Sequence, residues 1–247
     1  MQKSSADMAA QKTFVLVHGA WHGGWCYARV AEILRAAGHR VYTPTLTGLG
    51  ERAHLFSGNI TLDTHVQDVV SVFEYEDLRE VHLCGHSYGG FVISGAVERV
   101  PERIASLTFL DAFVPADGES LIDISLRPGP SRQLVGAMAN GGLGVPPIPA
   151  ANFNVNAADR DEVDRKCGPQ PIGTLLQRIR LTGARERCAA KTYVRAAAYA
   201  SAGFDSYRAQ CAADPSWHVT DVQCGHDVML DMPHELAALL VQSAARV

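Results

Sequence analysis

The chain has 247 residues, of which 47% are hydrophobic and 19% are charged. A chain of this length can bury one sizeable core, and alternating α/β proteins of this size often form a single domain. The net charge of −4 supplies no basic field, which argues against binding to nucleic acid or to an anionic membrane surface. A neutral or weakly polar small molecule is the partner that this composition favours.

The N-terminal segment, residues 1–12, is polar and rich in alanine, and we expect it to be disordered. It lacks the apolar stretch of a signal peptide or of a membrane span. The six cysteines form no C-x-x-C pair and are interpreted as reduced, mostly buried thiols: Cys26, Cys84, Cys167, Cys188, Cys211 and Cys224. These features predict a cytoplasmic protein.

Strands and helices alternate through the first half of the chain, as the spacing of apolar residues indicates. In chain order, the pattern predicts a strand at 13–17, a helix at 25–37, a strand at 40–43, a helix at 61–75, a strand at 80–84, a helix at 87–100 and a strand at 104–110. Gly38 and Pro101 follow the first and third helices and are typical of helix ends.

The alternation breaks after Asp111, where residues 112–190 carry many prolines among helix-like pieces. This stretch is too long for a simple strand-to-helix connection, so we interpret it as an inserted cap that covers the site. The core then comprises residues 13–111 and 191–247. It resumes with strands at 192–196 and 217–223 and closes with an amphipathic helix at 233–245. The alternation predicts an α/β fold with a mostly parallel central sheet and helices on both faces.

The most informative motif is Gly85-His86-Ser87-Tyr88-Gly89, which lies between a predicted strand and a predicted helix. The G-x-S-x-G pattern in this context is typical of a nucleophile elbow, a sharp turn that exposes a serine. Glycine at positions 85 and 89 lets the two backbones pass closely. We therefore predict that Ser87 is a nucleophile.

Two further candidates follow predicted strands, and the carboxyl ends of parallel strands meet at one edge of the sheet. His226 follows the last strand and can act as the general base toward Ser87. A carboxylate must orient this histidine. Asp111 is our prediction for it, because Asp111 ends the strand at 104–110; the alternatives are Asp205, Asp227 and Asp231.

The loop His18-Gly19-Ala20-Trp21-His22-Gly23-Gly24 follows the first strand, and its glycine-rich backbone can aim the Ala20 amide at the same point as the Tyr88 amide. We predict that these two amides form an oxyanion hole. Phosphate binding is disfavoured, because the G-x-G-x-x-G pattern and the P-loop lysine are missing. No further ligand has metal-binding spacing near this loop, so neither a metal nor a cofactor is expected. The side chains predicted to line an apolar pocket are Trp21, Phe113 and Met229.

The segments 14–26, 85–90 and 225–227 resemble the α/β-hydrolase superfamily. They are most similar to the branch that holds plant methylesterases, salicylate-binding esterases and hydroxynitrile lyases, with bacterial relatives that hydrolyse small esters, pyrethroids and benzimidazole carbamates. The resemblance implies a serine esterase with an acyl-enzyme intermediate, Ser87 as nucleophile and His226 as base. It does not transfer the acid: the usual aspartate position falls near Ala197, so Asp111 rests on its position alone.

The sequence therefore predicts a cofactor-free carboxylic ester hydrolase, monomeric or homodimeric, for small neutral esters with aromatic or hydrophobic groups, including methyl esters or carbamates. A hydroxynitrile lyase is one alternative, although Gly19 and Asp227 stand where those lyases have threonine and lysine. A small-ligand receptor on the same fold, without turnover, is the other.

Overall fold

The computed structural model describes residues 10–125, 132–139 and 141–247, so residues 1–9 of the predicted disordered N-terminus lie outside the described part. Its centre is a six-stranded sheet in the order β2-β1-β3-β4-β7-β8, in which every neighbouring pair is parallel. The strands are β1 (Thr13–Val17), β2 (Arg40–Tyr42), β3 (Val81–His86), β4 (Ile104–Leu110), β7 (Ala190–Ala196) and β8 (Trp217–Val222). The predicted α/β fold with a mostly parallel sheet is confirmed.

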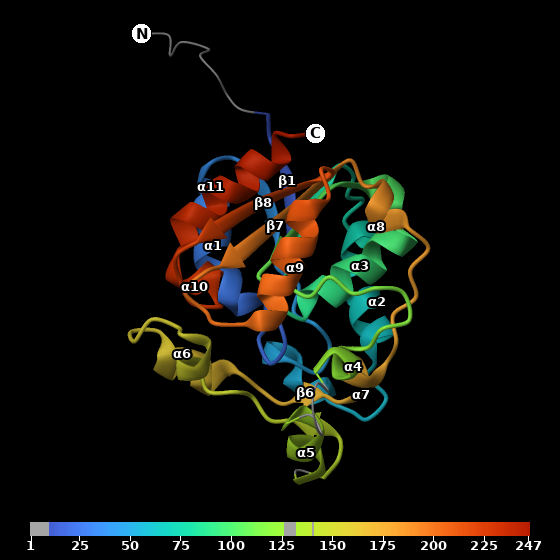
Figure 1. The fold of residues 1–247 in the computed structure, drawn as a ribbon, viewed down its shortest axis with the longest axis vertical. Helices are drawn as coiled ribbons and strands as arrows, with labels where there is room; N and C mark the ends of the chain where they lie inside the picture. Colours follow the sequence, from blue (N-terminus) through green and yellow to red (C-terminus); the bar gives the residue numbers. More distant parts are fainter. Residues whose placement is uncertain (1–9, 126–131, 140) are drawn as a thin grey trace.

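Helices cover both faces of this sheet, as Figure 1 shows. One face carries α1 (Ala28–Ala36) and α11 (Pro233–Ala244), which pack against each other. The other carries α2 (Leu62–Tyr75), α3 (Gly89–Arg99) and α9 (Ala202–Ala213). Because both faces are covered, the central strands read as almost continuous apolar runs, and every residue of β3 is buried.

The helix boundaries differ from the prediction where local geometry decides them. The predicted helix at 25–37 starts as a 3-10 turn, η1 (Gly24–Tyr27), before α1 begins. The predicted helix at 87–100 begins only at Gly89, because Ser87 and Tyr88 form the turn that precedes α3. The sequence pattern did not predict α9. Its start is capped by Ser201, whose Oγ accepts a hydrogen bond from the Phe204 amide at 3.4 Å.

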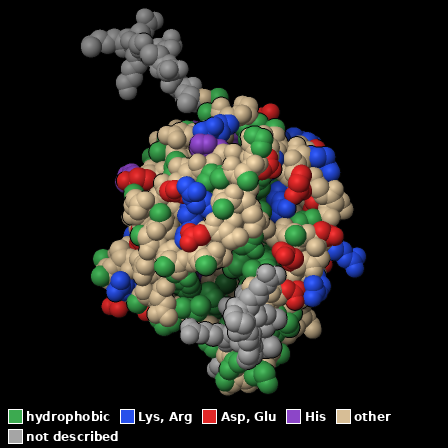
Figure 2. Space-filling model, in the orientation of Figure 1, with side chains coloured by type: hydrophobic (Ala, Val, Ile, Leu, Met, Phe, Trp, Pro, Cys, Tyr) green, Lys and Arg blue, Asp and Glu red, His purple; other side chains and the backbone are tan. Residues whose placement is uncertain are grey.

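The described parts of residues 112–190 form short elements, most of which lie at one end of the molecule, away from the two termini (Figure 1). The last of them, at 184–187, lies instead beside α3. They are α4 (Leu121–Ser125), α5 (Arg132–Ala139), β5 (Gly144–Val145), η4 (Ala150–Phe153), α6 (Arg160–Lys166), β6 (Gln170–Pro171), α7 (Gly173–Leu176), α8 (Ala184–Arg187). The predicted cap prolines Pro128 and Pro130 lie outside the described residues. Figure 2 shows a hollow with hydrophobic side chains toward this end. None of the described helices is long and apolar enough to cross a membrane.

Candidate active site

Ser87 lies in the sharp turn between β3 and α3. Its φ angle is +52°, in the left-handed region that non-glycine residues rarely adopt, and its amide donates a hydrogen bond to the Leu110 carbonyl at 3.2 Å. The residue is 9% exposed. A strained backbone of this kind at a strand-to-helix turn is the geometry of a nucleophile elbow. The structure thus places Ser87 as the motif predicts.

The elbow requires glycine at position 85 because two backbone segments cross there. A Cβ atom added to Gly85 would lie 2.5 Å from the Gly89 carbonyl oxygen and 3.0 Å from Ile93 Cγ2. We expect Gly85→Ala to destabilise the fold by about 1–3 kcal/mol, because backbone has to move to make room. Urea unfolding measures the change. Gly168→Ala is the control, since nothing lies within 4 Å of its added Cβ; a similar loss in both variants would contradict the steric argument.

His226 and Asp111 meet at the carboxyl edge of the sheet. The His226 Nδ1 lies 2.6 Å from Asp111 Oδ2, and both residues are buried. Asp111 adopts a φ of +41° directly after β4, which turns its side chain toward the end of β8. An ionised carboxylate only accepts hydrogen bonds, so Nδ1 carries the proton and Nε2 is left as a base. This is the arrangement that a serine–histidine mechanism requires.

Aromatic rings enclose the His226 imidazole. Phe204 stacks on it with ring centroids 5.1 Å apart, and Tyr199 and Phe153 lie 4.9 and 5.3 Å from it. On another side, the His86 ring is 4.5 Å away, and its Nε2–H donates to the His226 carbonyl at 3.0 Å. These contacts fix the plane of the imidazole and limit the access of water to its hydrogen bond with Asp111.

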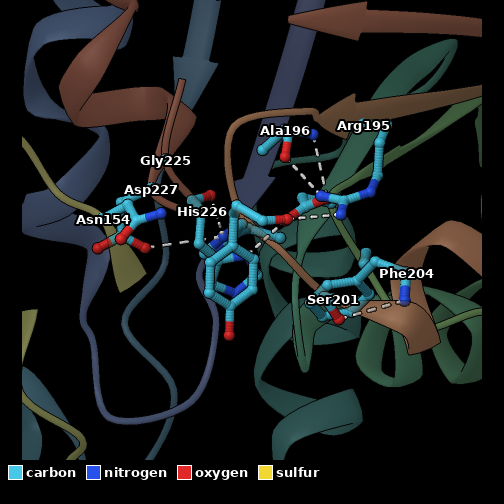
Figure 3. Close-up of polar contacts among 12 residues, drawn as sticks. Asn154, Arg195, Ala196, Ser201, Phe204, Gly225, His226 and Asp227 are labelled. Carbon is cyan, nitrogen blue, oxygen red and sulfur yellow. Dashed lines mark hydrogen bonds and ion pairs between the residues drawn. The ribbon is translucent and has the colours of Figure 1, made fainter. Parts of the chain in front are cut away.

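The alternative acids have other partners. Asp205 is paired with Arg195 at 2.9 Å, and its side chain is 63% exposed. Asp227 pairs with His22 at 3.2 Å. Asp231 accepts hydrogen bonds from Asn156 and from the Gly225 amide. In Figure 3, His226 lies between Asp227 on one side and Arg195 on the other. Of the four predicted carboxylates, Asp111 is the one that hydrogen-bonds the His226 ring.

Hydrogen bonds from two histidines shape the loop after β1. Leu46 N–H donates to His18 Nε2 at 3.0 Å, so the proton of His18 is on Nδ1, which donates to the Gly19 carbonyl at 2.8 Å. His22 Nδ1 donates to the Ala20 carbonyl at 2.8 Å. The next amide, that of Trp21, donates a hydrogen bond to Gln170 Oε1 at 3.0 Å. These bonds tie down the carbonyl groups of the loop around Ala20.

Two amides at this place remain available to a ligand. No described group accepts a hydrogen bond from the amide of Ala20 or from that of Tyr88. Both residues line the same cavity as Ser87. Such amides can stabilise an oxyanion that develops beside the serine, as predicted for this pair.

His22 and Asp227 form a buried ion pair behind the loop. Burial opposes protonation of His22, but the charge and hydrogen bond of Asp227 outweigh it and hold the pKa of His22 well above 6.5. Burial likewise opposes ionisation of Asp227, and His22 outweighs it and lowers the pKa of Asp227 below 3.8. The Asp227 contribution to stability is therefore lost as the pH falls through its lowered pKa. The His22 contribution is lost as the pH rises through its raised pKa.

Three other fully buried histidines are neutral and predict acid lability. Burial lowers the pKa of His18 to about 3 and of His65 to about 4, and it holds the pKa of His86 well below 6.5. Below pH 6.5 the unfolded chain therefore binds more protons than the folded one, so stability falls with pH. At pH 5 His18 and His65 each cost about 2 kcal/mol, or about 4 kcal/mol together, and His86 adds to this loss.

Urea unfolding at pH 7 and pH 5 measures this loss. His82→Gln is expected to reduce the pH dependence, because burial also lowers the pKa of His82 to about 4. His54 is exposed, so His54→Gln is the control and should leave the dependence unchanged. Equal free energies of unfolding at the two pH values would contradict the prediction.

Ser87 and His226 both line a cavity of about 180 Å³. Among its described lining residues none is Asp, Glu, Lys or Arg; the full set is Ala20, Trp21, Ser87, Tyr88, Phe113, Leu121, Ile148, Phe153, Leu175, Tyr199, Ser201, Gly203, Phe204 and His226. The structure brings Trp21 and Phe113 to this cavity, but not Met229. Met229 is fully buried in α10 (Val228–Asp231), whose apolar side chains pack into the core.

A family model described as the alpha/beta hydrolase family matches residues 14–239. The chain belongs to this family. The matched range contains the six strands of the central sheet except the first residue of β1, and it contains Ser87, Asp111 and His226. The resemblance that the three sequence segments indicated is confirmed.

Two relatives that match most of the chain are named as esterases. The chain is 46% identical over 235 residues to the carbendazim hydrolyzing esterase of Nocardioides sp. (strain SG-4G), with 92% of this chain and 97% of the relative covered. It is 27% identical over 260 residues to esterase PIR7B of Oryza sativa subsp. japonica, with 96% of this chain and 97% of the relative covered. The solved structure of an extracellular alpha/beta-hydrolase from a Paenibacillus species superposes with a TM-score of 0.79 at 26% identity. The match covers 94% of this chain and 98% of that one.

Sequence reasoning missed several residues of the site. Phe153, Tyr199 and Phe204 pack around His226, and Arg195 contacts Asp111. A signal for Phe204 was present, because Phe204, Tyr207 and Cys211 follow helical spacing after the capping residue Ser201. An arginine within an apolar strand was a second signal, since a buried charge needs a partner.

Proposed function

We propose that this chain is a serine carboxylic ester hydrolase that works through an acyl-enzyme intermediate. One observation carries the proposal. Ser87 and His226 line one cavity, and the Asp111 carboxylate accepts a hydrogen bond from the far nitrogen of His226 at 2.6 Å. Membership of the alpha/beta hydrolase family and similarity to two esterases support it.

In the proposed reaction, Ser87 Oγ attacks the substrate carbonyl carbon while His226 Nε2 takes the hydroxyl proton. The amides of Ala20 and Tyr88 donate to the oxyanion of the tetrahedral intermediate. His226 then gives its proton to the leaving group, which departs and leaves the acyl group on Ser87. Water, deprotonated by His226, releases the acid in the same way. Asp111 stabilises the imidazolium in both halves of the reaction.

We further propose that the substrates are small, neutral molecules with an aromatic or hydrophobic group. Methyl esters and methyl carbamates are the chemical classes that we propose. Apolar and aromatic side chains dominate the cavity, and its described lining carries no carboxylate or cationic amine to bind a charged substrate. The 46% identity to an esterase named for carbendazim hydrolysis supports the inclusion of carbamates.

The test is hydrolysis of a panel of p-nitrophenyl esters, aryl methyl esters and aryl methyl carbamates, together with a fluorophosphonate probe that labels activated serines. We expect turnover of the neutral short substrates and a phosphonyl group on the peptide that contains Ser87, located by mass spectrometry. Turnover of only charged or long-chain lipid esters would contradict the substrate class. Absence of both turnover and labelling would overturn the hydrolase mechanism in favour of a lyase or a receptor.

A further inference from the structure

Strand β7 carries a buried arginine beside the acid of the candidate site. The Arg195 side chain is 3% exposed, and its neighbours on the strand are buried as well. Burying a guanidinium group is costly unless it is paired and hydrogen-bonded. The hydrogen bonds that compensate this cost therefore show which groups Arg195 positions.

The guanidinium group of Arg195 donates to groups of four residues. Its Nη1 contacts Asp111 Oδ1 at 2.8 Å and the Ala196 carbonyl at 2.5 Å. Its Nη2 donates to the Tyr199 carbonyl at 2.6 Å, and its Nε to Asp205 Oδ1 at 2.9 Å. Figure 3 shows the Arg195 side chain next to Ala196, to the right of His226. A single side chain thus joins β4, the loop after β7 and the start of α9.

The two oxygens of Asp111 have separate partners. Oδ1 accepts from Arg195 and from the Ala196 amide at 3.1 Å, whereas Oδ2 accepts from His226. Rotation of the carboxylate away from His226 would break the contacts of Oδ1 as well. The planar fork of an arginine fixes such a geometry in a way that a lysine ammonium does not.

We propose that Arg195 is a positioning residue for the hydrolase: it holds Asp111 with Oδ2 turned toward His226, and its positive charge opposes protonation of His226. The inference rests on the proposed function. It adds a cation to the acid–base pair, and this cation lies on β7, two residues before Ala197, the position at which the resembling family has its usual aspartate.

Arg195 is the described cation in direct contact with Asp111. The other titratable groups around the Asp111–His226 pair differ from it in charge or in distance. Burial is the main cause that raises the pKa of Tyr193, Tyr199 and Cys224, so these groups stay neutral near pH 7. Burial also keeps His86 neutral by lowering its pKa. Among the described residues, the other charged groups near the pair are Asp205 on α9, Asp231 beside Gly225, and the ion pair of Asp227 with His22. Removing the charge of Arg195 should therefore make the His226 imidazole easier to protonate.

The test compares Arg195→Met and Arg195→Lys in the full chain. We expect Arg195→Met to lower kcat/KM by about 10- to 100-fold, the effect of losing a charge-assisted hydrogen bond. We also expect it to move the acidic limb of the pH profile upward by about 1 pH unit. Arg195→Lys keeps the charge but not the fork, so it should lower kcat/KM by about 10-fold and leave the acidic limb in place.

Arg208→Met is the matched control, because Arg208 on α9 forms a partly exposed pair with Asp221. It should change neither kcat/KM nor the pH profile. An NMR titration of the His226 imidazole tests the same idea without turnover: its midpoint should rise in Arg195→Met and stay in Arg195→Lys. Wild-type kcat/KM and midpoint in both Arg195 variants would overturn the role of Arg195.

The readouts separate the two hypotheses. If wild type hydrolyses no substrate, the proposed function fails, while the NMR titration still decides the role of Arg195. If Arg195→Met does not fold, Arg195→Lys decides it: a wild-type kcat/KM in that variant, or an acidic limb that moves with the charge retained, would overturn the inference.

Discussion

Ser87→Ala is expected to lower kcat for ester hydrolysis by about a million-fold, because the acyl-enzyme route is lost with the nucleophile oxygen. The fold should be retained, since the substitution removes one oxygen from a residue that lines a cavity. Steady-state hydrolysis of an aryl methyl ester measures the loss, and fluorophosphonate labelling should vanish with it.

Ser94→Ala is the matched control for this variant. Ser94 lies on α3, is fully buried, and donates its hydroxyl to the Gly90 carbonyl at 2.7 Å, a bond within one helix. We expect wild-type activity from Ser94→Ala. A Ser87→Ala variant that binds substrate and still turns it over would exclude Ser87 as the nucleophile. A wild type that binds the ester without turnover would favour a receptor.

Much of the fold was predictable because its signals are local. Both faces of the sheet are covered, so each central strand is a short apolar run, and residues 13–17 and 104–110 were predicted with the bounds that the structure shows. The helix α9 was missed because only Phe204, Tyr207 and Cys211 of its residues are buried, which gives a weak apolar stripe.

The placement of Ser87, Asp111 and His226 on one edge of the sheet was predictable from topology. Each follows a parallel strand, and the carboxyl ends of β3, β4 and β8 lie on one edge of the sheet. Side-chain direction was not predictable in the same way. Met229 follows His226 by three residues, yet α10 turns it into the core, away from the cavity.

The residues that enclose His226 depend on contacts between distant segments. Phe153 comes from η4 and Tyr199 from the loop after β7, and neither follows a motif. The contact of Arg195 with Asp111 joins residues 84 positions apart. Periodicity carries no information on such pairs, because it describes which face of an element is apolar and not what that face meets.

Asp111→Asn is expected to lower kcat by about ten-thousand-fold, because an asparagine amide can donate to Nδ1 and stabilise the wrong tautomer of His226. It also removes the buried counter-charge of Arg195 and leaves it only the solvent-exposed Asp205, so we expect a stability loss of about 3–5 kcal/mol. Thermal unfolding measures this loss, and kcat is therefore determined per folded molecule, with the folded fraction at the assay temperature taken from the unfolding curve.

Asp205→Asn distinguishes the two carboxylates that share Arg195. The Asp205 side chain is 63% exposed, so its ion pair with Arg195 is screened by solvent, and the contact of Arg195 with Asp111 does not depend on it. We expect kcat to fall by less than about five-fold in this variant. The reverse result, a large loss in Asp205→Asn and a small one in Asp111→Asn, would place the acid on α9. His226 would then have to leave its 2.6 Å contact with Asp111 during turnover.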